Sequence, residues 1–280
     1  MLAQIRTLRW WIWGLVCICN IQYGSAQELL VNVYGRQYTL LNGKWNAIID
    51  PYQQGRKTAI YRNRALKDKA DFKEYAFEGG LRLNVPSDWN SQIPELKYYE
   101  GTMWYARKFE INKKSDENLF LYFGAVNYRC RVYLNGTLIG SHEGGFTPFQ
   151  FNVTNVVKEG GNFLAVEVDN TRTADAIPAL SFDWWNYGGI TRDVMLVHTP
   201  KNYIRDYFIQ LDKYDSDRVH AEVQLSAQNA GQLVKIEIPE LKIANKVFTD
   251  GTGLAKATFR VRNLERWSPQ APKLYQVIVS

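Results

Sequence analysis

The sequence predicts an all-β protein built from two consecutive domains. Three observations support this prediction: apolar and polar residues alternate with a period of two, no segment of about 12 residues or more shows a helical stripe, and glycine and proline interrupt the chain at short intervals. With 46% hydrophobic and 14% aromatic residues against 22% charged ones, the 280-residue chain can bury a substantial core. This composition excludes disordered, collagen-like and small disulfide-rich proteins.

Residues 1–26 predict a secretory signal peptide. Arg6 and Arg9 form a basic start, residues 10–21 are apolar, and residues 24–26 are small, as a cleavage site requires. The apolar run of about 12 residues is shorter than the roughly 20 that cross a bilayer as a helix. We therefore expect export to the periplasm or beyond the cell, with no membrane span in the mature chain. A retained membrane anchor is the alternative.

The charge of the mature chain does not suggest a nucleic-acid partner. Loss of the signal peptide lowers Lys+Arg from 34 to 32 against 28 acidic residues, so the formal net charge falls from +6 to +4. The longest mixed run, residues 62–74, interleaves both signs as a solvated loop does. Cys130 is the one cysteine that remains, so we expect no internal disulfide and an inward-packed thiol.

The first domain, residues 27–200, contains several strand patterns. Leu119–Phe123 is continuously apolar, which predicts a strand covered on both faces. Residues 128–134 alternate, and Asn135-Gly136 then gives the strongest short hairpin signal, because both positions tolerate positive φ. The same alternation recurs at residues 164–168 and 194–198.

The second domain, residues 201–280, has shorter strands separated by Asp, Ser, Asn and Gly. The predicted strands are residues 203–211, 219–227, 234–238, 246–248 and 255–261. About 80 residues suffice for most of an immunoglobulin-like β-sandwich. Residues 273–280 alternate as a further strand with no turn or polar tail after it, so we expect this domain to be truncated at its C-terminus.

The motifs of hydrolytic, nucleotide and metal sites are missing from the sequence. The mature chain carries His142, His198 and His220, but no metal-ligand spacing, no G-x-S-x-G elbow and no phosphate-binding glycine loop between a strand and a helix. We expect neither a metal nor a cofactor, and we interpret His142 and His198 as structural residues.

Residues 181–193, SFDWWNYGGITRD, have the composition of a sugar site. Aromatic faces can cover the apolar face of a pyranose, while Asp183 and Asn186 could hydrogen-bond its hydroxyls. Two glycines follow and allow a sharp turn. On composition alone the alternative is equally open, namely that the tryptophans belong to the core and Asp183 caps a turn.

Several segments of the first domain agree in order, spacing and turn chemistry with a known family. They are LNGKW (41–45), VPSDWN (85–90), YEGTMWYAR (99–107), residues 123–154 and DWWNYGGITRDVML (183–196). Together they resemble the amino-terminal sugar-binding domain of glycoside hydrolase family 2, the β-galactosidases and β-glucuronidases. Trp267-Ser268-Pro269 resembles the end of that family's immunoglobulin-like second domain. Asn186-Tyr187 leans towards the β-glucuronidase branch.

The resemblance implies a jelly-roll (galactose-binding-like) β-sandwich followed by an immunoglobulin-like β-sandwich. It implies the non-catalytic N-terminal region of an exported retaining β-glycosidase with a carbohydrate substrate and, by analogy, homo-oligomeric assembly. Family members carry two catalytic glutamates about 5 Å apart on a (β/α)₈ barrel. The chain ends before any such pattern, so we assign no catalytic residue and expect the chain alone to be inactive.

The family's D-x-x-x-[YM]-x-G-I pattern assigns a sugar-hydroxyl contact to Asp183, with Trp185 and Asn186 as neighbouring substrate-binding candidates. Two other hypotheses remain, a stand-alone carbohydrate-binding module and a structural adhesion domain. We expect Trp45, Trp89 and Trp104 to pack the core. Further expectations are that residues 144–149 form a sharp loop that turns an aromatic ring inward, and that Arg192 pairs with a buried acid.

Overall fold

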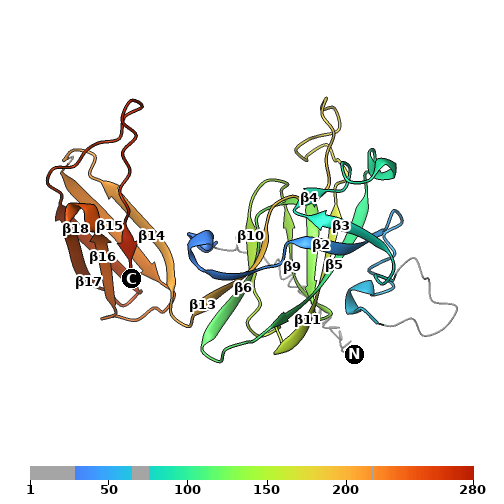
Figure 1. Ribbon diagram of the computed structural model, residues 1–280, viewed down its shortest axis with the longest axis horizontal. Helices are drawn as coiled ribbons and strands as arrows, with labels where there is room; N and C mark the ends of the chain where they lie inside the picture. Colours follow the sequence, from blue (N-terminus) through green and yellow to red (C-terminus); the bar gives the residue numbers. More distant parts are fainter. Residues whose placement is uncertain (1–28, 65–75, 216) are drawn as a thin grey trace, which may run out of the picture.

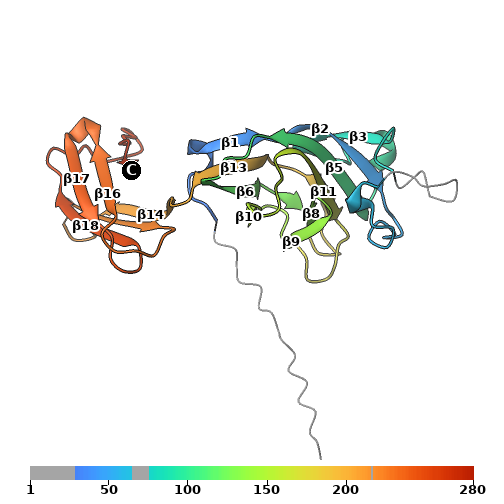
Figure 2. The ribbon, with the colours of Figure 1, turned by 90° about the horizontal axis from the view of Figure 1, so that it is seen from below.

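A computed structural model describes residues 29–64, 76–215 and 217–280. The predicted signal peptide and most of the mixed-charge run lie outside these residues. The regular secondary structure of the described chain is almost entirely β-strand, arranged in two β-sandwiches that lie end to end (Figures 1 and 2). Its helices are single 3₁₀ turns, η1 (Val33–Gly35), η2 (Ile60–Arg62), η4 (Pro94–Leu96) and η5 (Pro239–Leu241). Among the described residues, no helix is long and apolar enough to cross a membrane.

The first sandwich packs a six-stranded antiparallel sheet against a four-stranded one. The larger sheet has the order β3-β2-β5-β11-β8-β9, with β2 (Gly43–Ile49), β3 (Leu81–Val85), β5 (Thr102–Ile111), β8 (Arg129–Leu134), β9 (Thr137–Glu143) and β11 (Gly160–Asp169). The smaller has the order β1-β13-β6-β10, with β1 (Gln37–Leu40), β6 (Glu117–Phe123), β10 (Phe149–Asn152) and β13 (Val194–Pro200). A short third sheet, β4-β12-β7, consists of β4 (Ser87–Asp88), β7 (Val126–Asn127) and β12 (Gly189–Ile190).

The predicted hairpin is confirmed between β8 and β9. Asn135 and Gly136 have φ values of 52° and 82°, the left-handed conformation that a tight hairpin turn needs at both positions. Cys130 faces the core beside Val132, and burial raises the pKa of its thiol to about 12. Period-two alternation on β8 therefore separates a core face from a polar face, as predicted.

The tryptophans predicted to be buried are buried, but they do not share one core. Trp45 and Trp89 lie between the two sheets of the sandwich. Trp104 lies on the other face of the six-stranded sheet, where Ile60 and Phe77 cover it. Strand β5 is therefore buried on both faces, and its tryptophan packs against the connection that follows β2.

The apolar run Leu119–Phe123 forms β6 and is covered on both faces, as predicted. Leu119, Leu121 and Phe123 face the main core, while Phe120 and Tyr122 pack in a second cluster with Leu30 and Val33. A strand that is buried on both faces has no polar face, which explains the continuous apolar sequence.

The second sandwich pairs a sheet β14-β15-β18 with a sheet β17-β16-β19. Its strands are β14 (Ile204–Leu211), β15 (Arg218–Leu225), β16 (Leu233–Ile238), β17 (Ile243–Phe248), β18 (Leu254–Arg260) and β19 (Ile278–Val279). Its core contains Val223, Ile236 and Ala255.

The strand expected over residues 273–280 is much shorter in the structure. Only Ile278–Val279 form a strand; Glu237 lies opposite Ile278, and Ser280 exchanges backbone hydrogen bonds with Lys235. Continuing this antiparallel pairing towards residue 273 would bring the chain opposite Pro239, where β16 has already ended in the 3₁₀ turn η5. The alternation is present in the sequence, but the partner strand is missing there.

Candidate functional site

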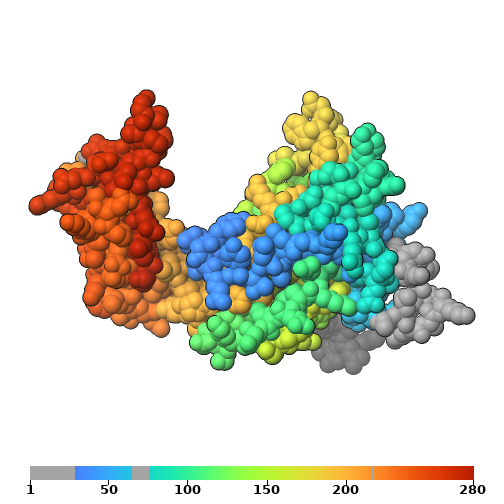
Figure 3. Space-filling model, in the orientation of Figure 1, coloured from blue at the N-terminus to red at the C-terminus, as the bar shows by residue number. Residues whose placement is uncertain are grey.

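The candidate sugar-binding residues lie on the connection between β11 and β12, residues 170–188. This connection projects from the end of the first sandwich beside the 94–101 turn (Figure 1). Figure 3 shows that it rises on the same side of the molecule as residues 262–277 of the second sandwich, with a broad hollow between the two domains. A further domain or a ligand on this side of the molecule would therefore be able to contact the loop.

The base of the loop is held by buried asparagines. Asn170 and Asn186 exchange hydrogen bonds, because each Nδ2 donates to the other's backbone carbonyl at 2.6 Å. Asn127 donates from Nδ2 to Oδ1 of Asn186 at 2.7 Å, and Oδ1 of Asn90 accepts from the backbone N–H of Gly188 at 2.9 Å. All four asparagine side chains lie in buried residues. Oδ1 of Asn127 has no hydrogen-bond partner among the described residues, but the other amide contacts fix the two ends of the loop in one arrangement.

The two glycines that end the loop are required for different reasons. A Cβ atom on Gly188 would lie 2.2 Å from Cζ2 of Trp89, so the backbone approaches the buried indole too closely for any side chain. Gly189 has φ +148°, and its Cβ would lie 2.6 Å from the carbonyl oxygen of Ser87. The sharp turn predicted from the sequence is therefore enforced by close packing as well as by backbone conformation.

Trp185 is half-buried between two loops. Its ring meets Tyr98 edge-on at 5.7 Å, and Cζ of Arg172 lies 5.0 Å from its centroid. Arg172 is held in turn by Glu100, to which it donates from Nε at 3.0 Å and from its backbone N–H at 2.8 Å. The indole Nε1 is buried and has no hydrogen-bond partner in the described part of the chain. Trp185 therefore has a fixed ring plane and an unused donor.

The predicted site residues occupy different depths of the loop. Asp183 is exposed, and beside it Trp184 is 54% exposed and meets Phe182 edge-on at 4.5 Å. Asn186 is 2% exposed, and its amide is already used by Asn127 and Asn170. The exposed part of the loop thus presents a carboxylate between aromatic rings, while Asn186 anchors the base.

Sequence reasoning did not identify Asn90, Asn127 and Asn170. They are far apart in the chain, and no local pattern distinguishes them from surface asparagines. Exposed apolar side chains at and near the loop were also missed, namely Tyr98, Ile177 and Leu180. Together with Trp184 and Tyr187 they make the surface at this end of the first sandwich unusually apolar for a solvent-facing region.

The histidines interpreted as structural have packing partners. Nδ1 of His198 lies 2.9 Å from Oε2 of Glu117. Burial opposes ionisation of this carboxyl, but the His198 contact and the Lys114 backbone N–H outweigh it and lower the pKa of Glu117. His142 lies on β9, and its ring stacks on Phe149 at 4.2 Å.

The remaining structural expectations have mixed outcomes. Phe149 is 5% exposed, so residues 144–149 do turn an aromatic ring inward. Arg192 donates to the backbone carbonyl of Phe146 at 3.2 Å instead of to a buried acid. Within residues 29–64, 76–215 and 217–280, no group of three or more His, Cys, Asp or Glu residues could hold a metal ion.

The described chain is a jelly-roll-like β-sandwich joined to an immunoglobulin-like β-sandwich. Comparison with family models agrees: residues 39–200 match the sugar binding domain of glycosyl hydrolases family 2, and residues 202–280 match a second model of glycosyl hydrolases family 2. The chain therefore belongs to glycoside hydrolase family 2.

The chain is similar to glycoside hydrolases of two activities. It is 26% identical to the β-glucuronidase of Rattus norvegicus over 94% of this chain and 44% of that protein. It is 30% identical to the β-galactosidase of Clostridium acetobutylicum over 85% of this chain and 28% of that protein. The chain therefore spans less than half the length of these relatives.

Solved structures with the same architecture include two β-glucuronidases. That of an uncultured Clostridium sp. aligns with a TM-score of 0.70 and 28% identity over 88% of this chain and 42% of that one. That of Bifidobacterium dentium, complexed with coumarin-3-O-glucuronide, aligns with a TM-score of 0.71 and 25% identity over 87% of this chain and 45% of that one.

Proposed function

We propose that this chain is the N-terminal, non-catalytic region of an exported retaining β-glycosidase that acts on terminal galactose- or glucuronate-type residues. In this proposal the two β-sandwiches support a barrel that carries the catalytic carboxylates, and the 170–188 loop reaches its active site. The observation that carries the proposal is the exposed Asp183 on a loop whose base is fixed by Asn170 and Asn186. Membership of glycoside hydrolase family 2 supports it.

The chemical role proposed for Asp183 is to bind sugar hydroxyls. A carboxylate accepts hydrogen bonds from two hydroxyls at once, and the rings of Trp184 and Trp185 can cover the apolar face of a pyranose. Because the base of the loop is fixed before substrate arrives, little conformational entropy is lost on binding. Asn186 is a positioning residue in this scheme, since its amide is fully used within the loop.

The proposed export depends on the predicted signal peptide. The basic start, the apolar run and the small residues of positions 1–26 support cleavage and release into the periplasm or the medium. N-terminal sequencing of the mature protein tests this: a start at Gln27 supports export, and a start at Met1 contradicts it.

The proposed activity is tested by extending the reading frame beyond the codon for Ser280 and assaying the complete product. We expect hydrolysis of p-nitrophenyl β-D-galactoside or β-D-glucuronide by the complete protein and none by residues 27–280 alone. Proton NMR of the first product should show the β-anomer, because a retaining enzyme preserves configuration through two displacements. An α-anomer contradicts the mechanism. A stop codon close after Ser280 contradicts the enzyme and favours a stand-alone carbohydrate-binding module.

A further inference from the structure

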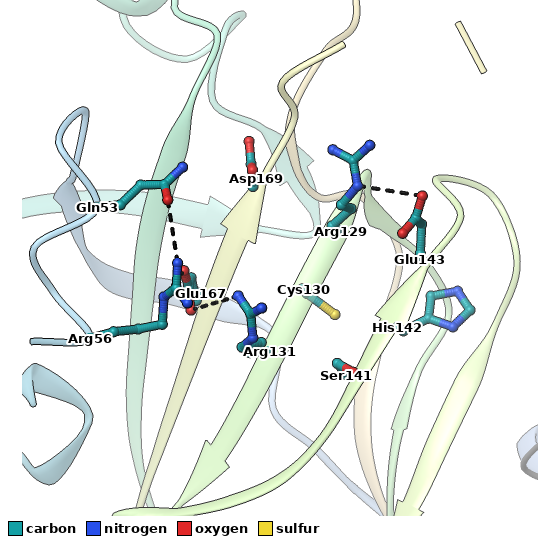
Figure 4. Close-up of a pocket in the computed structure, with 10 residues that line it drawn as sticks. All are labelled: Gln53, Arg56, Arg129, Cys130, Arg131, Ser141, His142, Glu143, Glu167 and Asp169. Carbon is teal, nitrogen blue, oxygen red and sulfur yellow. Dashed lines mark hydrogen bonds and ion pairs between the residues drawn. The ribbon is translucent and has the colours of Figure 1, made fainter. Parts of the chain in front are cut away.

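A second polar site lies on the outer face of the six-stranded sheet. A cavity of about 410 Å³ opens over β8, β9 and β11, on the side opposite the core-facing Val132 and Val166 (Figure 4). Its lining residues come from these three strands and from the connection after β2: Gln53, Arg56, Arg129, Cys130, Arg131, Ser141, His142, Glu143, Glu167 and Asp169. We call this cavity the sheet groove. None of its lining residues belongs to the 170–188 loop.

The charges of the sheet groove balance. Three guanidinium groups face three carboxylates, so the formal charge of the lining is zero. Arg129 Nε lies 3.4 Å from Glu143 Oε1, and Arg56 Nε lies 3.1 Å from Glu167 Oε1. Such a lining offers donors and acceptors in similar number and favours neither an anion nor a cation. It matches a ligand whose groups both donate and accept.

Glu167 at the floor of the groove has an unused acceptor. The residue is 4% exposed, and its Oε2 is buried and accepts no hydrogen bond from the described residues. Arg131 Nη1 lies 3.6 Å from Oε2, which is beyond hydrogen-bond length. Burial also raises the pKa of Glu167, despite the opposing effects of Arg56 and Arg131. A hydroxyl that donates to Oε2 would satisfy this atom and stabilise the carboxylate.

The two arginines beside Glu167 retain accessible donors. The side chains of Arg56 and Arg131 are 41% and 45% exposed, and Figure 4 shows them on either side of Glu167. A hydroxyl beside Arg131 can accept from its guanidinium, while the neighbouring hydroxyl of the same sugar donates to Glu167. A carboxylate or sulfate ligand could only accept, and would leave Glu167 Oε2 unsatisfied next to a second negative charge.

We propose that the sheet groove binds a neutral, hydroxyl-rich segment of a glycan chain. Glu167 Oε2 accepts from one hydroxyl and Arg131 donates to its neighbour, while Ser141 and Gln53 line the edges of the site. This goes beyond the proposed function, because it places a carbohydrate site outside the Asp183 loop and needs no catalytic barrel. Its failure would leave the glycosidase proposal untouched, and the reverse also holds.

The test is titration of the ¹⁵N-labelled chain, followed by NMR, with a matched pair of probes. Cellotetraose is neutral. The β-1,4-glucuronan tetramer differs from it only in that each sugar residue carries a carboxylate at C6 in place of the hydroxymethyl group. Neutral galacto- and xylo-configured tetrasaccharides extend the panel. We expect at least one neutral tetrasaccharide to shift the signals of Arg131 and Ser141, with an affinity that changes less than about twofold between 50 and 500 mM NaCl.

Variants locate the binding. Arg131→Gln should weaken it about tenfold, because a charge-assisted donor is lost while the exposed position tolerates the change. Arg82→Gln, an exposed arginine on β3 outside the groove, is the matched control and should leave it unchanged. Asp183→Ala should also leave it unchanged. Urea denaturation confirms that each variant is folded.

Three results would overturn the proposal. One is the absence of shifts at the groove with every neutral tetrasaccharide. Another is tighter binding of the glucuronan with a steep loss in salt, which would indicate an anion site. The third is binding that Asp183→Ala removes and Arg131→Gln does not affect, which would place the sugar on the loop.

Discussion

Asn170 and Asn186 clasp the two ends of the candidate sugar-binding loop, because each side-chain amide donates to the other's backbone carbonyl at 2.6 Å. Asn170 is fully buried and makes a further hydrogen bond, in which its Oδ1 accepts from the backbone N–H of Gly101 at 2.8 Å. The pair converts a long connection into a loop with a fixed base. An exposed carboxylate such as that of Asp183 can then have a defined position without being buried itself.

Replacing Asn170 should loosen this clasp. Asn170→Ala leaves the carbonyl of Asn186 and the N–H of Gly101 without their present partner, so we expect the free energy of unfolding to fall by about 2–4 kcal/mol. The measurement is urea denaturation followed by tryptophan fluorescence. Asn84→Ala, at an exposed position on β3, is the matched control and should change it by less than about 0.5 kcal/mol. Equal effects of the two substitutions would show that the clasp contributes nothing.

Gly188 lies against the ring of Trp89, whereas Gly161 has open space around it, so the same substitution at the two positions isolates the effect of the close approach. In Gly188→Ala the new methyl would lie 2.2 Å from Trp89, so we expect a loss of about 1–3 kcal/mol in the free energy of unfolding. A Cβ on Gly161 meets no described atom within 4 Å, and Gly161→Ala should be nearly neutral. Denaturation midpoints of the two variants provide the comparison. A stable Gly188→Ala protein would contradict the packing described.

Asp212 should titrate unusually low. His220 Nε2 lies 2.5 Å from Asp212 Oδ2, and the backbone N–H groups of Tyr214 and Asp215 donate to Oδ1, so the pKa of Asp212 falls to about 2. Because this pKa is depressed in the folded state, the stability it contributes is present above the ordinary value of 3.8 and is lost as the pH falls towards 2.

The pKa of Asp212 can be followed by NMR of its side-chain carboxyl carbon. His220→Ala should raise it towards 3.8, because the largest cause of the depression is removed. Thr258→Ala is the control: Thr258 Oγ1 lies 3.0 Å from Nδ1 of the same ring and does not touch the carboxylate. A midpoint near 4 in the unmodified chain would contradict the contact.

Much of the fold could be predicted from alternation and turn chemistry. Every second residue of β8 and β11 packs in the main core, and Asn135-Gly136 marks the hairpin because both residues adopt positive φ. Family resemblance then supplied the jelly-roll and immunoglobulin-like architectures, which periodicity alone cannot distinguish from other sandwiches.

The parts that could not be predicted depend on partners distant in the sequence. Trp104 looked like a core residue, yet the face it packs on is decided by Ile60 and Phe77 in another connection. The strand expected over residues 273–280 is short because β16 ends at Ile238. Asn170 and Asn186 are 16 positions apart, and no local pattern shows that they bond each other.

The proposed function requires the exposed carboxylate of Asp183 to bind substrate in a family 2 active site. This can be measured as kcat/KM of the complete protein on its preferred β-glycoside, with Asp183→Ala compared with Ser181→Ala from the same exposed stretch. We predict a fall of about 10- to 100-fold for Asp183→Ala, with an unchanged melting temperature, and no change for Ser181→Ala. Equal kcat/KM values for Asp183→Ala and the unmodified enzyme would contradict the account.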